Sequence, residues 1–164
     1  MRVTVVVPTY NENDNIEILC RGVLAVVPSA HILIVDDGSP DGTADTAERL
    51  GADNEAISVV RRAEKLGLGS AYRAGLRAAI DAGAEICVQM DADLSHDAAL
   101  LPALIANVEL GADLAIGSRY VPGGRTVNWP SGRRRLSRWG NRYAAGVLGL
   151  AVNDATAGDR KSVV

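Results

Sequence analysis

The sequence of residues 85–97 is EICVQMDADLSHD, and it places two carboxylates, Asp91 and Asp93, directly after a short apolar run. We interpret residues 85–90 as a buried β-strand, because the run is short and mainly apolar. Alternate side chains of an extended segment share a face, so both carboxylates are expected to point the same way. Charges so close together repel each other, and a compensating partner is expected at the end of this strand.

The same kind of pattern continues along the chain in both directions. Short apolar runs predict further strands at residues 2–7, 31–35, 56–60 and 112–117, and Pro8 is expected to end the first of them. Helical spacing or alanine content predicts helices at residues 13–27, 43–50, 70–82 and 98–108, the first with an Asn or Asp as its cap. This alternation predicts an α/β fold, with a mostly parallel central sheet and helices on both faces.

The overall composition sets limits on the class of protein. The 164 residues suffice for one domain with a core, and the net charge of -3 gives no global field that would favour nucleic acid. No signal peptide and no run of about 18 apolar residues is visible, which favours a cytosolic or peripheral protein. Cys20 and Cys87 lie in apolar patterns, and we expect buried free thiols in preference to a disulfide.

Polar clusters follow four of the predicted strands. They are PTYNEN at residues 8–13, DDGSPDGT at 36–43, DADLSH at 91–96 and GSRYVPGG at 117–124. In an open parallel sheet, ligands bind beyond the carboxyl ends of the strands. We therefore expect these clusters to meet at one edge of the sheet and to form the functional site there.

The acidic pair fits a hard divalent cation. Mg²⁺ and Mn²⁺ are commonly held by one or two carboxylates together with diphosphate oxygens and water, so Asp91 and Asp93 are candidate metal ligands. The alternative for the pair is a solvated turn and helix cap.

The clusters after the first two strands suit a nucleotide. Tyr10 can pack on a nucleobase, and Glu12 can hold the base edge or the ribose. Asp36 and Asp37 can accept hydrogen bonds from a base or ribose, although Gly, Asp, Ser and Pro also favour a plain turn before a helix. Lys65 is a candidate for contact with the phosphates of such a nucleotide, and an ordinary surface lysine is the alternative.

Six ordered motifs carry a resemblance to a known family. They are VVVPTYNENDNI at residues 5–16, ILIVDDGSPDGT at 32–43, EKLGLGSAYRAGL at 64–76, DADLSHD at 91–97, GSRYVPGG at 117–124 and DATAG at 154–158. In order and spacing the chain resembles the family 2 glycosyltransferases, most closely the polyprenyl- and dolichyl-phosphate mannose synthases among them. The resemblance implies a single GT-A domain over residues 1–164. It also implies an inverting enzyme that uses Mg²⁺ or Mn²⁺ and moves mannose from GDP-mannose to a polyprenyl phosphate.

The resemblance also implies roles for individual residues. Asp91, Asp93 and Arg119 would be catalytic, and Ser95 would be a third, weaker metal position beside the two aspartates. The nucleotide, the diphosphate and the acceptor phosphate would be contacted by Pro8, Tyr10, Glu12, Val35, Asp37, Ala92, Arg119 and Arg133.

A basic segment lies between residues 121 and 142. It holds six arginines, Arg125, Arg133, Arg134, Arg135, Arg138 and Arg142, together with Trp129 and Trp139 and no acidic residue. Arginine forks bind phosphate, and basic residues with tryptophan suit an anionic membrane surface. We expect a loop that faces the lipid acceptor, in a protein peripheral to the cytoplasmic face of the membrane. A solvated loop and a nucleic-acid patch are the alternatives.

The chain departs from the family after Gly158, where it continues as DRKSVV and stops, as a truncated domain would. Two other functions therefore stay open. One is a nucleotide-sugar-binding domain without turnover, completed by a partner such as a membrane protein. The other is a family 2 transferase that uses UDP-glucose or another donor.

Overall fold

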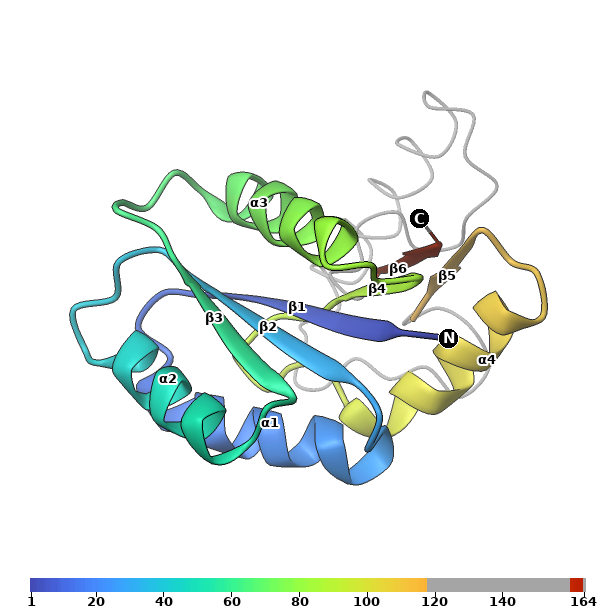
Figure 1. Cartoon of the computed structure of the whole chain (residues 1–164), viewed down its shortest axis with the longest axis horizontal. Helices are drawn as coiled ribbons and strands as arrows, with labels where there is room; N and C mark the ends of the chain where they lie inside the picture. Colours follow the sequence, from blue (N-terminus) through green and yellow to red (C-terminus); the bar gives the residue numbers. More distant parts are fainter. Residues whose placement is uncertain (118–159, 164) are drawn as a thin grey trace, which may run out of the picture. The chain divides into compact units, whose positions relative to one another are not determined.

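The computed structural model describes residues 1–117 and 160–163 (Figure 1). The chain divides into two compact units, residues 1–115 with 159–164 and residues 116–158, and the features below belong to the first, except Ile116 at the end of β5. The elements, in chain order, are β1 (Val3–Thr9), α1 (Asn13–Val26), β2 (His31–Asp36), α2 (Thr43–Asp53), β3 (Ile57–Arg61), α3 (Leu68–Asp81), β4 (Ile86–Gln89), the 3₁₀ turn η1 (Ala98–Leu100), α4 (Leu101–Glu109), β5 (Leu114–Ile116) and β6 (Arg160–Val163).

One sheet has the strand order β3-β2-β1-β4-β6-β5. β1 pairs in parallel with β2 and with β4, and β2 pairs in parallel with β3. The predicted mostly parallel sheet is therefore confirmed. The antiparallel strand β6, which pairs with β4, was not predicted from the sequence.

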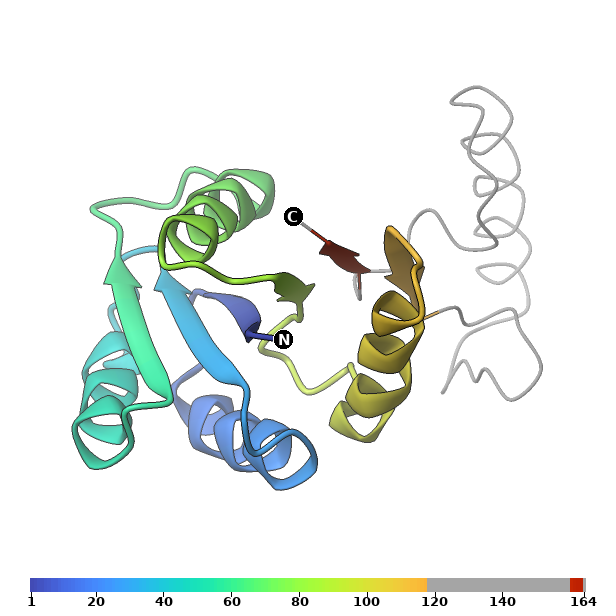
Figure 2. The same cartoon turned by 45° about the vertical axis from the view of Figure 1, so that its right-hand side comes forward.

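Helices cover both faces of the sheet, as predicted (Figures 1 and 2). Among the described helices, α3 is the one that packs against one face, over Val6, Leu33, Val35 and Cys87. Apolar side chains of α1, α2 and α4 form a larger core cluster on the other face. At Gly75 in α3, an added Cβ would lie 2.4 Å from Val6, so only glycine permits this close approach of the helix to β1.

The expectation that Pro8 ends the first strand is wrong, because β1 continues to Thr9. Val6 O accepts a hydrogen bond from Met90 N, so the polar backbone groups of Val6, and by alternation of Pro8, face β4. The register between β1 and β4 ends at the pair Val6 and Gln89. The missing N–H of Pro8 therefore falls where the β4 ladder has already stopped, and the strand loses no hydrogen bond there.

The predicted Asn or Asp cap of α1 is also wrong. Glu12 occupies the N-cap position and its side chain makes no capping hydrogen bond. The backbone N–H of Asn13 instead donates to Asp41 Oδ2 at 3.1 Å, from the loop before α2. The helix end is therefore satisfied by a partner that is distant in sequence.

Both cysteines are buried free thiols, as expected. Burial raises the pKa of Cys20 to about 11, so this thiol is a packing residue and a poor nucleophile. Among the described helices, none combines the length and the apolar character that crossing a membrane requires.

Candidate active site

A cavity of about 290 Å³ opens at the carboxyl ends of β1, β2 and β4. Three of the four strand-end clusters predicted from the sequence, residues 8–13, 36–43 and 91–96, meet in it, because these strands are parallel neighbours in the sheet. The fourth cluster, residues 117–124, lies outside the described residues after Gly117. The lining residues are Pro8, Thr9, Tyr10, Glu12, Asp37, Lys65, Leu68, Ala71, Asp91, Ala92 and Asp93.

Four of the predicted site residues are not among these lining residues. Val35 is fully buried in the core beneath α3. Ser95 is exposed and donates its backbone N–H to Asp93 Oδ1 at 2.9 Å, so it supports one of the acidic residues through its main chain. Arg119 and Arg133 lie outside the described residues.

Asp91 is held by one side chain of α3 and by one side chain of its own loop. The Tyr72 hydroxyl, on α3, donates to Asp91 Oδ1 at 2.6 Å. His96 accepts a hydrogen bond from the Asp91 backbone N–H on Nδ1 at 3.3 Å, and its Nε2 lies 3.8 Å from Asp91 Oδ2. The carboxylate is therefore fixed in orientation before any ligand enters.

Asp93 is a carboxylate whose charged form is favoured. Its partial burial acts to raise the pKa, but hydrogen bonds from Ser95 and the nearby His96 outweigh this, and the pKa lies below its ordinary value. Within residues 1–117 and 160–163, no group of three or more His, Cys, Asp and Glu side chains forms a closed metal cage. Asp91 and Asp93 both line the cavity, and two carboxylates are a donor set that fits Mg²⁺ or Mn²⁺ completed by diphosphate oxygens and water.

Asp37 lines the same cavity at the end of β2 and forms a buried ion pair. Arg62 Nη1 donates to Asp37 Oδ1 at 2.7 Å, and the two side chains are 12% and 6% exposed. Arg62 Nη2 donates to Ser70 Oγ on α3, also at 2.7 Å. The pair therefore ties the second strand to the start of α3.

An aromatic face and a cation meet at the mouth of the cavity. The Lys65 ammonium lies 3.7 Å from the centre of the Tyr10 ring, which is a cation–π contact. Glu12 Oε2 accepts from Asn15 at 2.7 Å. Lys65 therefore lines the cavity with Tyr10 beside it, and Glu12 lines the same cavity.

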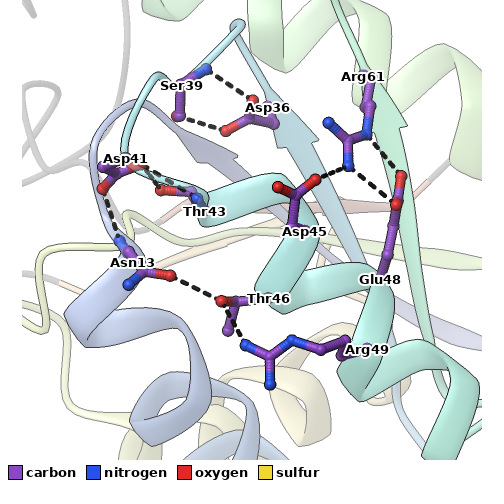
Figure 3. A network of polar contacts seen from close by, with 10 residues as sticks. All are labelled: Asn13, Asp36, Ser39, Asp41, Thr43, Asp45, Thr46, Glu48, Arg49 and Arg61. Atoms are coloured by element: carbon purple, nitrogen blue, oxygen red, sulfur yellow. Dashed lines mark hydrogen bonds and ion pairs between the residues drawn. The ribbon is translucent and has the colours of Figure 1, made fainter.

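The loop after β2 holds the loop after β1 in place (Figure 3). Buried Asp36 accepts from Thr9 Oγ1 at 2.9 Å and from the Ser39 backbone N–H at 2.9 Å. Asp41 joins the starts of the two helices, because it accepts from Thr43 of α2 at 2.6 Å and from Asn13 of α1. Figure 3 draws the contacts of Asp36 with Ser39 and of Asp41 with Asn13 and Thr43. Together with the Thr9 hydrogen bond to Asp36, they hold the backbone on both sides of Tyr10 and Glu12.

Sequence reasoning missed Arg62 and Tyr72. Arg62 directly follows β3, so the strand-end rule that found the other clusters also applied to residues 61–62. Tyr72 lies within a helix, and no local pattern shows that it faces Asp91. Only the packing of α3 on the sheet brings these two atoms together.

Residues 4–160 match the family described as Glycosyl transferase family 2. The chain belongs to glycosyltransferase family 2. The sequence-based assignment to this family is thereby confirmed, on a match that includes every strand-end cluster of the cavity.

Two curated relatives within this family share nearly half of their aligned residues with the chain. A polyprenol monophosphomannose synthase of Mycolicibacterium smegmatis is 48% identical over 97% of the chain, which spans 60% of that protein. An undecaprenyl-phosphate mannosyltransferase of Micrococcus luteus is 45% identical over 98% of the chain, which spans 65% of that protein. The chain therefore covers less than two thirds of the length of either relative.

Solved structures confirm the predicted GT-A fold of family 2. A glucosyl-3-phosphoglycerate synthase of Mycobacterium tuberculosis, in complex with Mn²⁺, UDP and phosphoglyceric acid, aligns with a TM-score of 0.69 over 99% of the chain and 55% of that protein, at 20% identity. A mannosyltransferase of Pyrobaculum calidifontis in complex with GDP-mannose and Mn²⁺ aligns with a TM-score of 0.50 over 56% of the chain and 27% of that protein, at 33% identity.

Proposed function

We propose that the protein transfers mannose from GDP-mannose to a polyprenyl phosphate, with Mg²⁺ or Mn²⁺. The observation that carries the proposal is the likeness, over nearly the whole chain, to two relatives named for making this class of product. The cavity is consistent with it, because an aromatic ring, a buried acidic residue and an acidic pair all line it. The mannosyltransferase in complex with GDP-mannose and Mn²⁺ adds support for the donor.

The assigned residues give the donor one direction in the cavity, with its base near Tyr10 and its diphosphate near Asp91 and Asp93. Tyr10 would stack on the base, Asp37 and Glu12 would accept hydrogen bonds from base and ribose, and Lys65 would meet the phosphates. Asp91 and Asp93 would hold the cation, which when bound supplies positive charge to the departing diphosphate. The Tyr72 hydroxyl and the Ser95 backbone N–H would keep the two carboxylates oriented toward it.

The reaction needs positioning more than proton transfer. An oxygen of the acceptor phosphate would attack the anomeric carbon as the bond to the diphosphate breaks, and the attacking oxygen is already ionised at neutral pH. The protein would then act by alignment of the two substrates and by electrostatic stabilisation of the leaving group. Arg119 and Arg133 are proposed to bind the acceptor phosphate, as arginine forks commonly do.

The test is calorimetric titration of the whole chain with GDP-mannose and with UDP-glucose, with and without Mn²⁺. GDP-mannose is expected to bind more tightly, and only with Mn²⁺ at full affinity. A product assay with radiolabelled GDP-mannose and polyprenyl phosphate then tests transfer. Tighter binding of UDP-glucose would refute the proposed donor.

Asp91→Ala and Asp93→Ala are the matched site variants. Each removes a carboxylate from the acidic wall, so each is expected to abolish the effect of Mn²⁺ on donor binding, a loss of about tenfold or more. Asp53→Ala, which removes an exposed carboxylate at the last residue of α2, is the control and should bind as the wild type does. Metal-dependent binding that survives both site changes would refute the assignment.

A second candidate is a donor-binding domain without turnover. The observation in its favour is that the aromatic and charged residues that line the cavity are all assigned to the donor and the cation, and none of them to the acceptor. Binding of GDP-mannose with Mn²⁺ but no labelled lipid in the product assay would support this candidate over the enzyme.

A further inference from the structure

Arg62 lies beside the cavity and does not line it. Its guanidinium donates to Asp37 Oδ1 on one side and to Ser70 Oγ on the other, both at 2.7 Å. The Arg62 backbone N–H also donates to Asp36 O at 2.7 Å, so the main chain of this arginine is anchored too. Arg62 is therefore connected to the cavity through Asp37, which lines it.

Asp37 in turn needs a fixed partner. Its side chain is 6% exposed, and a buried carboxylate is costly unless it is paired and hydrogen-bonded. Because Arg62 engages Oδ1, Oδ2 is the oxygen that remains for a ring N–H of a base in the cavity. Guanine and uracil carry such a ring N–H donor, whereas neutral adenine and cytosine do not.

We infer that Arg62 is the positioning residue for nucleobase recognition: its fork, anchored on Ser70, sets the direction in which Asp37 presents its carboxylate to the base. This inference rests on the proposed function, in which a nucleotide occupies the cavity. Through its hydrogen bond to Ser70, Arg62 links the start of α3 to the residue that recognises the base. Neither Arg62 nor Ser70 is among the residues that line the cavity.

The choice of substitution follows from the geometry. Arg62→Lys keeps a positive charge near Asp37 and so avoids an unpaired buried carboxylate. A lysine ammonium is a single point of contact and does not reproduce a planar fork bound to both Asp37 and Ser70. The adjacent Arg61 offers a matched control, because it is half-exposed and pairs with Asp45 and Glu48 on α2, away from the cavity.

The experiment measures binding of GDP and of pyrophosphate to the full chain, each with Mn²⁺. Pyrophosphate has no base, so it reports only on the acidic end of the cavity. Arg62→Lys is expected to weaken GDP binding about tenfold, the equivalent of one well-placed charged hydrogen bond, and to leave pyrophosphate binding unchanged. Arg61→Lys is expected to change neither.

Two results would overturn the inference: GDP binding to Arg62→Lys equal to that of the wild type, or an equal loss for GDP and pyrophosphate. Ser70→Ala removes only the second anchor and is expected to weaken GDP binding about threefold, with pyrophosphate again unchanged. If Arg62→Lys does not fold, the Ser70→Ala variant tests the inference in its place, and GDP binding equal to that of the wild type would overturn it. If the wild type prefers UDP, the same comparison is made with UDP, so a wrong donor does not count against Arg62. A wild type that binds neither nucleotide would refute both proposals.

Discussion

At the scale of single residues, Asp91 depends on Tyr72 for its orientation. The hydroxyl donates to Asp91 Oδ1 at 2.6 Å from the second turn of α3. Groups that orient metal ligands typically contribute about 10–100-fold to metal affinity. Tyr72→Phe removes only the hydroxyl oxygen, so we expect at least a tenfold rise in the Mn²⁺ concentration that half-saturates donor binding.

Nucleotide binding without metal separates an effect on the cation from an effect on the nucleotide. Tyr72→Phe should leave it unchanged, since the base end of the cavity is held by Arg62 and not by Tyr72. Equal Mn²⁺ dependence in the variant and the wild type would show that Asp91 is oriented without the hydroxyl.

The strand-end rule accounts for which site residues could be predicted. Tyr10, Glu12, Asp37, Asp91 and Asp93 follow apolar runs, and the structure brings all five to one cavity. The role of Tyr72 has no local signature, because it depends on where a helix packs on the sheet.

At the scale of elements, Asp41 joins α1 to α2. It accepts hydrogen bonds from the backbone of Asn13 and from Thr43. Slight burial acts to raise the pKa of Asp41, but these hydrogen bonds lower it by more, so the pKa lies below its ordinary value. A carboxyl with a depressed pKa stabilises the fold at pH values above its unfolded-state pKa. That stability is lost as the pH falls through the folded-state pKa.

Asp41→Ala is therefore expected to lower the free energy of unfolding by about 1 kcal/mol at neutral pH, the usual loss when a side chain that accepts hydrogen bonds at a helix N-terminus is removed. The difference from the wild type should shrink below about pH 4, where Asp41 becomes protonated in the unfolded chain and then in the folded one. Urea denaturation at several pH values measures this difference in the free energy of unfolding, with Asp53→Ala as the control at an exposed carboxylate. A difference that stays constant down to pH 2 would exclude the carboxylate as the cause.

Element order was predictable from the sequence, whereas element ends and one strand were not. Alternating apolar runs are enough to predict parallel strands and helices, because every β–α unit repeats the same pattern. Pro8 stays within β1 only because β4 stops early, which depends on a strand about 80 residues further along. β6 joins β4 from the far end of the chain, and residues 160–163 give no local sign of that pairing.

At the scale of the whole molecule, charge is unevenly distributed. The net charge is -3, yet residues 121–142 carry six arginines and no acidic residue. This segment lies outside the described residues, and its assignment to the lipid acceptor and the membrane stays a prediction. Basic residues near an anionic bilayer contribute about 1 kcal/mol each, and salt screens the effect.

Replacement of Arg133, Arg134 and Arg135 by Gln is therefore expected to lower partition onto anionic vesicles about a hundredfold, from the loss of about 3 kcal/mol. Co-sedimentation with vesicles rich in phosphatidylglycerol measures this partition. Vesicles of phosphatidylcholine alone should bind neither the wild type nor the triple variant. Replacement of Arg21, Arg49 and Arg77, all exposed on helices, removes the same charge elsewhere and is expected to have a much smaller effect. Equal losses from the two triple variants would mean that overall charge, and not the basic segment, governs membrane contact. No binding of the wild type to anionic vesicles at low salt would refute membrane contact by this segment.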